Sequence, residues 1–127
     1  MTNMIDVQIF DGLRQDMGEK FPELLQMFLK NSKIYLTTIE MNLLNGNADE
    51  ILSAAHNIKS SAGLFGLTKV SASAEALEAK MRVIPHSVAY NLPALTPLCK
   101  NLQDAFSEVE GVLKAETSRY IVTKETA

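Results

Sequence analysis

Hydrophobic residues recur every three to four positions in five stretches of the chain, and polar or glycine-containing segments separate these stretches. This spacing is typical of helices that bury one face. It predicts helices over residues 5–17, 20–45, 47–66, 68–84 and 96–115, the last of which could begin nearer to residue 92. No stretch alternates between apolar and polar residues over a useful length, so the sequence predicts no β-strand.

Residues that commonly end or begin helices lie at these boundaries. Gly18 follows the first helix, and a turn at residues 45–47, which contains a glycine, follows the second. Glycine commonly ends a helix, so both positions are predicted helix ends. Asn47 with Glu50 three residues later matches the capping-box pattern at the start of the third helix. Thr68 and Thr96 are predicted N-caps of the fourth and fifth helices, and Pro97 is the predicted first residue of the fifth. Pro85 is expected to end the fourth helix, and residues 86–93 are expected to form a loop.

Four substantial helices with short connections favour an antiparallel up-and-down four-helix bundle. An additional short N-terminal helix is expected to pack across one end of the bundle, which makes the fold all-α. The chain fits a single domain over residues 1–127, with a core from about residue 5 to 115. We expect residues 117–127 to form a C-terminal tail that is loose beyond Thr123.

Composition and charge exclude several classes of function. The net charge of −3 gives no basic surface for nucleic acid. No apolar run approaches the roughly 18 residues of a membrane span, and no signal peptide is visible, so we expect a cytoplasmic protein. Cys99 is the single cysteine and His56 and His86 are the two histidines, too few for a disulfide or a zinc site. We therefore expect no bound metal.

The stretch that contains His56 has an unusual surface for a helix. On a helical wheel of about 100° per residue, one group of side chains falls within roughly 40° of a line and forms a buried stripe. This stripe consists of Ile51, Ala55, Ile58, Ala62 and Phe65. His56 points roughly 140° away from that line, and on its side lie Lys59, Ser60, Gly63 and Leu67.

The small residues beside His56 favour close approach by another molecule. Glycine inside a helix costs about 1 kcal/mol relative to alanine, so a helix built for stability alone would not place Gly63 there. Close packing between helices is the alternative, and it suits Ala55 and Ala62 better than it suits Ser60 and Gly63. We interpret this face as a docking site for the active site of another protein.

The neighbours of His56 restrict its possible chemistry. No base and orienting acid are visible at the spacing of a nucleophilic triad, and no glycine-rich phosphate loop precedes a helix. A neutral imidazole is a nucleophile at physiological pH, and Lys59 one turn away could offset the charge of a phosphoryl group. What remains is a histidine that accepts and donates a group while a partner supplies the catalysis. His86, in the predicted loop, is treated as structural or incidental.

The run from His56 to Ala62, HNIKSSA, with Gly66 ten residues after the histidine, resembles the signature of the histidine-containing phosphotransfer (HPt) domain. That signature has histidine, a hydrophobic residue, lysine and three small residues, followed by glycine. The stretches FPELLQMFL and AEALE resemble the helices before and after the motif, so the resemblance covers about residues 5–115. One departure is Ser60, where many members have glycine; serine is still small, and its hydroxyl could bond the phosphoryl group.

The resemblance implies that His56 is the phosphoacceptor, through Nε2, in a phosphorelay. Lys59 would stabilise the phosphoryl group, Gly66 would serve helix geometry and packing, and Ser60, Gly63 and Leu67 would line the docking face. It further implies a monomer without kinase or ATPase activity and without a bound cofactor. Its partners would be receiver domains of response regulators, which supply Mg²⁺ and the acceptor aspartate, and a hybrid histidine kinase.

Two other functions stay open at this point. The chain could be a bundle that docks on receiver domains and regulates them without carrying phosphate. It could also be the dimeric phosphoacceptor region of a histidine kinase that has lost its ATPase domain. Such dimerisation helices usually have glutamate after the histidine and Thr-Pro after the basic residue, whereas here Asn57 follows His56 and Ser60 follows Lys59.

Overall fold

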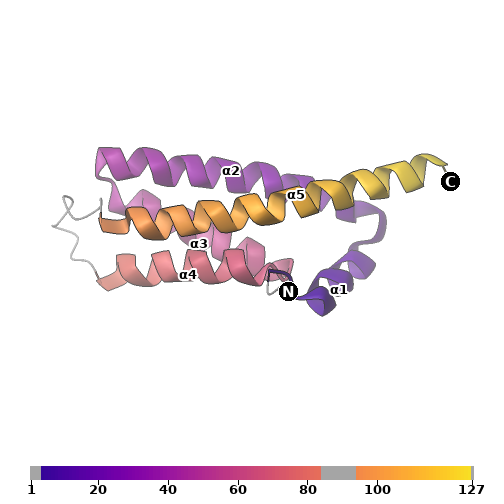
Figure 1. The fold of residues 1–127 in the computed structure, drawn as a ribbon, viewed down its shortest axis with the longest axis horizontal. Helices are drawn as coiled ribbons and strands as arrows, with labels where there is room; N and C mark the ends of the chain where they lie inside the picture. The colour runs from indigo at the N-terminus through magenta and orange to yellow at the C-terminus, as the bar shows by residue number, and fades with distance from the viewer. Residues whose placement is uncertain (1–3, 84–93, 127) are drawn as a thin grey trace.

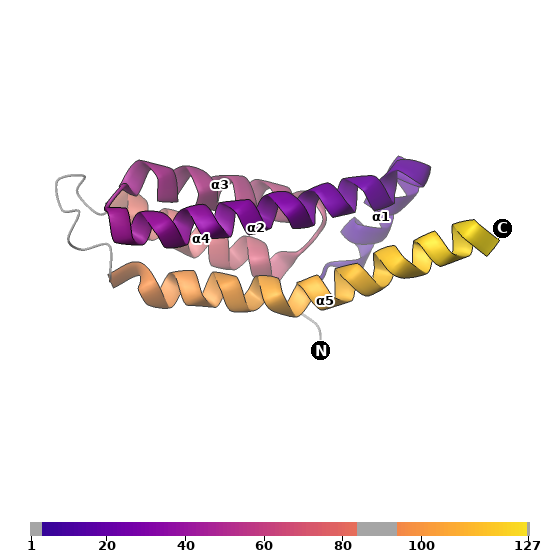
Figure 2. The same cartoon turned by 90° about the horizontal axis from the view of Figure 1, so that it is seen from above.

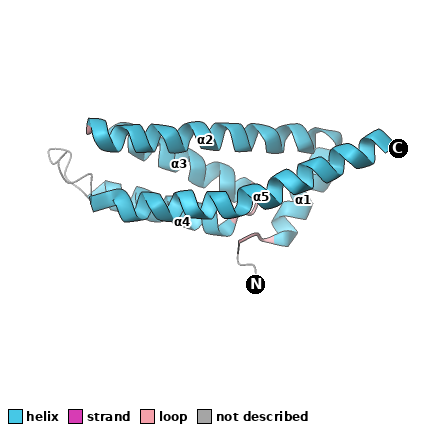
Figure 3. Cartoon of the chain, turned by 45° about the horizontal axis from the view of Figure 1, so that its top comes forward, coloured by secondary structure: helices cyan, strands magenta, loops and turns pink. Residues whose placement is uncertain are grey.

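The computed structural model describes residues 4–83 and 94–126. Their elements are α1 (Val7–Met17), the 3-10 turn η1 (Gly18–Lys20), α2 (Phe21–Asn45), α3 (Ala48–Leu64), α4 (Thr68–Val83) and α5 (Thr96–Thr126). All of the described elements are helices, as Figure 3 shows. The predicted all-α fold is confirmed. Within the described residues, no helix combines the length and the apolar character needed to cross a membrane.

Local interactions at the helix ends explain most of the boundaries. Gly18 and Gly46 follow α1 and α2 with φ of 54° and 78°, a conformation that glycine adopts at little cost. The side chain of Asn47 accepts a hydrogen bond of 3.2 Å from the Glu50 amide and caps α3. The predicted boundaries at Gly18, Gly46 and Asn47 are therefore confirmed.

The C-terminal end differs from the prediction. Helix α5 continues to Thr126, whereas we expected a tail from residue 117. No glycine or proline follows Gly111, so nothing in the backbone chemistry interrupts the helical hydrogen bonding. Figures 1 and 2 show α5 extending beyond the bundle at the end where α1 lies. The predicted loop 86–93, with His86, and the predicted helix end at Pro85 lie outside the described residues.

Helices α2 to α5 form a closed bundle. Helix α3 packs against α2 and α4, and α5 packs against the same two helices from the other side. Chain direction alternates from helix to helix (Figure 1), which confirms the antiparallel up-and-down topology. Helix α1 contacts α2 and α3 and lies at one end of the bundle (Figure 2).

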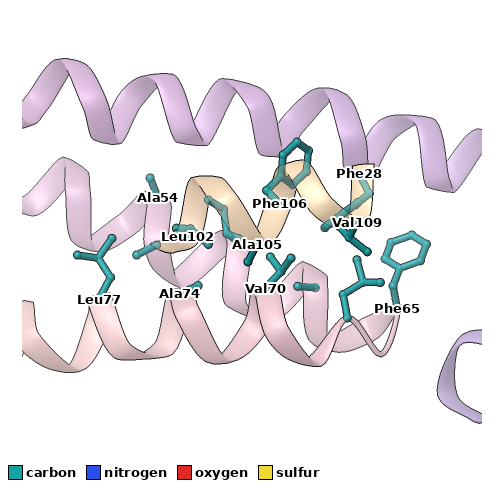
Figure 4. Packing of buried hydrophobic residues seen from close by; sticks show 14 of the residues in the cluster. Phe28, Ala54, Phe65, Val70, Ala74, Leu77, Leu102, Ala105, Phe106 and Val109 are labelled. Atoms are coloured by element: carbon teal, nitrogen blue, oxygen red, sulfur yellow. The ribbon is translucent and has the colours of Figure 1, made fainter. Parts of the chain in front are cut away.

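The core contains side chains from every helix of the bundle. Figure 4 shows apolar groups from α2, α4 and α5 meeting those of α3, including Phe28, Phe65 and Phe106. The Phe28 and Phe65 ring centroids lie 5.0 Å apart in a tilted arrangement, a favourable geometry for aromatic pairs. The predicted stripe on α3 is confirmed, because all five of its residues are at most 2% exposed. This burial fixes the rotation of α3 and turns His56 outward.

Candidate functional site

His56 lies on the outer surface of α3, and 52% of its side chain is exposed. Its orientation follows from the buried stripe on the opposite side of the same helix. Because α3 packs against α4, the imidazole is also within reach of side chains from α4. The site therefore combines an exposed ring with partners that the core of the bundle holds in place.

The partner that holds His56 is Glu78 of α4, whose side chain is only 4% exposed. Its Oε2 lies 2.9 Å from Nδ1 of His56 and 2.7 Å from Nη2 of Arg82. Its Oε1 lies 2.6 Å from Nζ of Lys59. One buried carboxylate thus contacts three nitrogen-bearing side chains from two helices.

These contacts keep Glu78 charged in spite of its burial. Burial alone would raise the pKa of a carboxyl group. Here hydrogen bonds from Lys59 first, then Arg82 and, more weakly, His56, lower the pKa of Glu78 to about 2. A buried charge persists in a folded protein when it is paired in this way. Glu78 is therefore a carboxylate at every physiological pH.

The carboxylate determines which nitrogen of a neutral His56 carries the proton. An ionised carboxylate only accepts hydrogen bonds, so the ring must donate from Nδ1. The other nitrogen, Nε2, then keeps its lone pair. The ring is half exposed, so the side chain that bears this lone pair is open to solvent.

Lys59 lies one turn after His56 on α3, and 32% of its side chain is exposed. Its ammonium group is bonded to Glu78 in this structure and so lies close to the ring without contacting it directly. An ammonium group has three N–H donors. It can therefore keep its bond to Glu78 and offer another donor to an anion that arrives at His56.

Ser60 and Gly63 are exposed on α3, as predicted from the helical wheel. A Cβ atom added to Gly63 would come no closer to the rest of the chain than 3.9 Å, at Oγ of Ser71. Packing within this chain therefore does not require a glycine at this position. A shallow groove beside Gly63 continues this surface toward α1, and its lining includes Ile9, Gly66, Thr68, Ser71, Ala72 and Glu75.

Leu67 also borders this groove, but its side chain is not exposed beside Ser60 and Gly63 as the helical wheel predicted. It is fully buried, and its amide donates to the carbonyl of Ala62 at 2.9 Å. Helix α3 ends at Leu64, and Gly66 follows with φ of 73°. The chain therefore turns before Leu67, and the helical wheel no longer describes where its side chain points.

Gly66 has a structural position in the turn between α3 and α4. An added Cβ would lie 2.8 Å from Cβ of Ile9 and 2.9 Å from the carbonyl oxygen of Asp6, which is too close for either contact. The carbonyl of Gly66 accepts a bond of 2.7 Å from the Asp6 amide. This glycine ends α3 through its positive φ, with its amide bonded to the Gly63 carbonyl, and it also allows the start of α1 to approach the turn closely.

Sequence reasoning missed Glu78 and Arg82, although the pattern of α4 contained a signal. Ala74, Leu77 and Met81 are the buried apolar residues of this helix around Glu78. Positions 74, 77, 78 and 81 follow the i, i+3, i+4, i+7 spacing of one helix face. A glutamate within that series is a charged residue at a core position. Such a residue requires a cationic partner, and Arg82 lies four residues later.

In the described ranges 4–83 and 94–126, no three histidine, cysteine, aspartate or glutamate side chains gather where they could hold a metal ion. Cys99 is buried in the core, and burial raises the pKa of its thiol to about 11. This cysteine therefore behaves as a small apolar side chain.

Comparison with known proteins gives two findings. Residues 23–119 match the family described as Hpt domain. The crystal structure of histidine-containing phosphotransfer protein B (HptB) from Pseudomonas aeruginosa PAO1 is similar, with a TM-score of 0.82 and 23% sequence identity. The similarity covers 94% of this chain and 99% of that one, and at this identity it shows a shared fold. No curated protein matches the chain.

Proposed function

The chain belongs to the Hpt domain family, whose members have a histidine phosphotransfer role in phosphorelays, and we propose that it carries the phosphoryl group on Nε2 of His56. The observation that carries this proposal is the 2.9 Å contact between Nδ1 of His56 and the buried carboxylate of Glu78. In the neutral ring this contact leaves Nε2 unprotonated, and half of the His56 side chain is exposed. Accessibility, orientation and nucleophilicity thus coincide at one atom.

The transfer step uses the lone pair of Nε2. It attacks the phosphorus of an aspartyl phosphate on a receiver domain, a nitrogen–phosphorus bond forms, and the bond to the aspartate oxygen breaks. The aspartate leaves as a carboxylate, and the proton on Nδ1 of His56 stays in place. The phosphorylated ring is then an imidazolium, and the carboxylate of Glu78 offsets its positive charge. The reverse reaction returns the phosphoryl group to an aspartate.

Lys59 and the small residues of α3 have separate roles in this proposal. Lys59 donates a hydrogen bond to a phosphoryl oxygen while its ammonium group stays beside Glu78. Ser60 and Gly63 allow the partner to come close to α3, since neither residue projects a large side chain. The acidic residues and Mg²⁺ needed for the reaction come from the receiver domain.

The proposal extends to partners and setting. We expect response-regulator receiver domains and a hybrid histidine kinase as partners, because a carrier needs one protein to load it and another to unload it. The chain itself is expected to be a cytoplasmic monomer that binds no cofactor and has no kinase or ATPase activity. Size-exclusion mass checks the monomeric state, and an ATPase assay checks the absence of ATPase activity.

The first experiment is a transfer assay with a panel of phosphorylated receiver domains. Wild type is compared with His56→Gln, and with His86→Gln as the control that removes the other histidine. We expect acid-labile, base-stable label on wild type and on His86→Gln, and none on His56→Gln, with helical circular dichroism unchanged in all three. Label that persists on His56→Gln would contradict the proposal. Receiver binding without any label would favour the regulator that carries no phosphate.

A further inference from the structure

Helix α2 has a second apolar stripe, on the side that faces away from the core. The buried residues of α2 form the first stripe, which accounts for the place of this helix in the bundle. The second, which we call the α2 stripe, consists of Met27, Ile34 and Met41, each 53% to 56% exposed, and of Leu44, which is more exposed still. Four of the nine large apolar side chains that are exposed in the described residues thus lie on one helix.

The residues of the α2 stripe have the spacing of a seam between two helices. Single exposed apolar side chains are ordinary on a protein surface. Met27, Ile34 and Met41, however, are seven residues apart, and Leu44 follows three residues after Met41. A step of seven residues turns the side chain by only about 20° around the helix, so the three form one line. Such a line fits the matching stripe of a second helix.

The α2 stripe is separate from the site around His56. Figure 1 shows α2 along one long edge of the bundle and α4, which carries Glu78, along the opposite edge. His56 opens to solvent beside α4, where it contacts Glu78. A partner on the outer face of α2 therefore leaves the imidazole accessible.

The α2 stripe is symmetric about Ile34, which favours a second copy of this chain as its occupant. Met27 lies seven residues before Ile34, and Met41 lies seven residues after it. A two-fold contact uses the same surface of both copies, so that surface must match itself. If two copies of α2 lie antiparallel with the two-fold axis at Ile34, each Met27 meets Met41 of the other copy. The apolar side chains of the two stripes then coincide.

Charges beside the α2 stripe favour the same antiparallel arrangement. Lys30 and Glu40 are exposed, and neither makes an ion pair within the described part of the chain. By helical phase they lie about 40° and 120° from Ile34, on the same side of the stripe. In the antiparallel pair, Lys30 lies opposite residue 38 of the other copy, which is two residues, or about 3 Å along the axis, from Glu40. Opposite charges therefore meet on both sides of the two-fold axis, whereas a parallel pair in register would bring like charges together.

We propose that the α2 stripe is a self-association surface, through which two copies of this chain pair antiparallel with Lys30 of each copy facing Glu40 of the other. The proposal does not depend on the phosphotransfer proposed for His56. A contact made by one helix alone falls short of the roughly 800 Å² per partner that stable complexes bury. Pairing is therefore weak, with a dissociation constant of about 0.1–1 mM. The monomer expected above is the state at low micromolar concentration.

Sedimentation equilibrium tests the pairing directly. The purified chain is measured from about 10 µM to about 1 mM, a range that covers weak association. We expect the average mass of wild type to rise from that of one chain toward that of two. Ile34→Glu should keep the mass of one chain throughout, because two carboxylates would meet at the two-fold axis. Val7→Glu is the matched control, since Val7 is also an exposed apolar residue but lies on α1, and this variant should associate like wild type.

Charge reversal tests the contact between Lys30 and Glu40. Lys30→Glu and Glu40→Lys each set two like charges opposite one another, so each should raise the dissociation constant about five- to tenfold. The double variant places opposite charges together again and should return to within about twofold of wild type. A double variant that associates no better than either single variant would overturn the antiparallel pairing. Helical circular dichroism of each variant confirms that it is folded.

Cysteine cross-linking tests the register of the two helices. An added oxidant takes two electrons from two thiols that meet, and a disulfide forms between the copies. The native Cys99 is buried and serves as an unreactive background. Ile34→Cys should cross-link to itself, whereas Met27→Cys should cross-link only with Met41→Cys, because the two copies of residue 27 lie about 21 Å apart along the axis. Self-cross-linking of Met27→Cys would indicate a parallel pair and would overturn the proposal.

Sedimentation has three results that would overturn the proposal. Wild type that keeps the mass of one chain up to about 1 mM does not self-associate. Equal association of Ile34→Glu and wild type would place the contact on another surface. Equal loss of association in Ile34→Glu and Val7→Glu would show that exposed apolar side chains associate without a defined partner surface. Each result leaves the transfer assay at His56 unaffected, so the two proposals fail separately.

Discussion

Two carboxylates of this bundle are each held by a pair of cations, one on the α3–α4 face and one on the α2–α5 face. Glu78 contacts Lys59 and Arg82. Glu110 of α5 contacts Lys33 at 2.6 Å and Lys114 at 3.3 Å, both through Oε2. Pairing with the cations lowers the pKa of both carboxyl groups. As ionic arrangements the two are alike.

The difference between the two lies in burial and in the third partner. Glu78 is almost fully buried and also contacts His56, whereas 19% of the Glu110 side chain is exposed and Glu110 contacts the two lysines. A carboxylate with two cations is thus a structural device that this chain uses twice. What distinguishes the α3–α4 face is a histidine, His56, which contacts the same oxygen of Glu78 as Arg82 does.

The largest difference in phosphotransfer rate is expected between variants that each lack one of the two carboxylates. Glu78→Ala takes away the group that orients His56, so we expect the rate of phosphotransfer to fall about 10- to 100-fold, as when an imidazole loses its orienting partner. Glu110→Ala should leave the rate unchanged. Both rates come from a time course of label transfer from one phosphorylated receiver domain. If the rate of phosphotransfer fell equally in the two variants, Glu78 would have no functional role that Glu110 lacks.

Acid should weaken the Glu78 cluster more than the Glu110 cluster. The pKa of Glu78 falls from its ordinary 4.5 to about 2 on folding, so its charge stabilises the protein fully above about pH 4.5. This contribution, at most about 3 kcal/mol, disappears as the pH falls toward 2. Urea unfolding at several pH values should show the advantage of wild type over Glu78→Gln shrinking over this range. A difference that does not depend on pH would contradict the role of the charge.

Two exposed glycines allow a matched test of docking. Gly63 on α3 and Gly111 on α5 both have room for a side chain, since no atom lies within 3.4 Å of an added Cβ at either position. We expect Gly63→Leu to weaken receiver binding about tenfold because leucine fills the space that the partner approaches. Gly111→Leu should bind like wild type in the same calorimetric titration. Unchanged affinity for Gly63→Leu would place Gly63 outside the interface.

The smallest effect is expected for the two lysines. Lys59→Ala should still accept the phosphoryl group, but the phosphohistidine should decay about threefold faster because one charge-assisted hydrogen bond is lost. Lys33→Ala, which removes the corresponding cation from Glu110, should decay at the wild-type rate. Phosphorus NMR of both variants measures the decay. A Lys59→Ala lifetime equal to that of wild type would refute the electrostatic role of Lys59.

Periodicity predicted the bundle because each helix buries one stripe, as α3 does with Ile51, Ala55 and Ile58. The same reasoning placed His56 correctly, since its orientation depends only on the rotation of its own helix. It failed for Leu67, where a turn at Gly66 ends that rotation. It also failed to find Glu78, because the contact joins residues 22 positions apart and depends on how α3 and α4 pack.

The contact between Asp6 and Gly66 separates the proposed chemistry at His56 from one wall of the groove on which we propose that the partner docks. The groove beside Gly63 has one wall on α1, at Ile9, and this wall is attached to the bundle through the turn at Gly66. A substitution at Ile9 therefore reshapes the groove without moving any atom bonded to Glu78. A lineage could change which partner it accepts by altering the N-terminal helix alone, while the reaction at His56 stays the same.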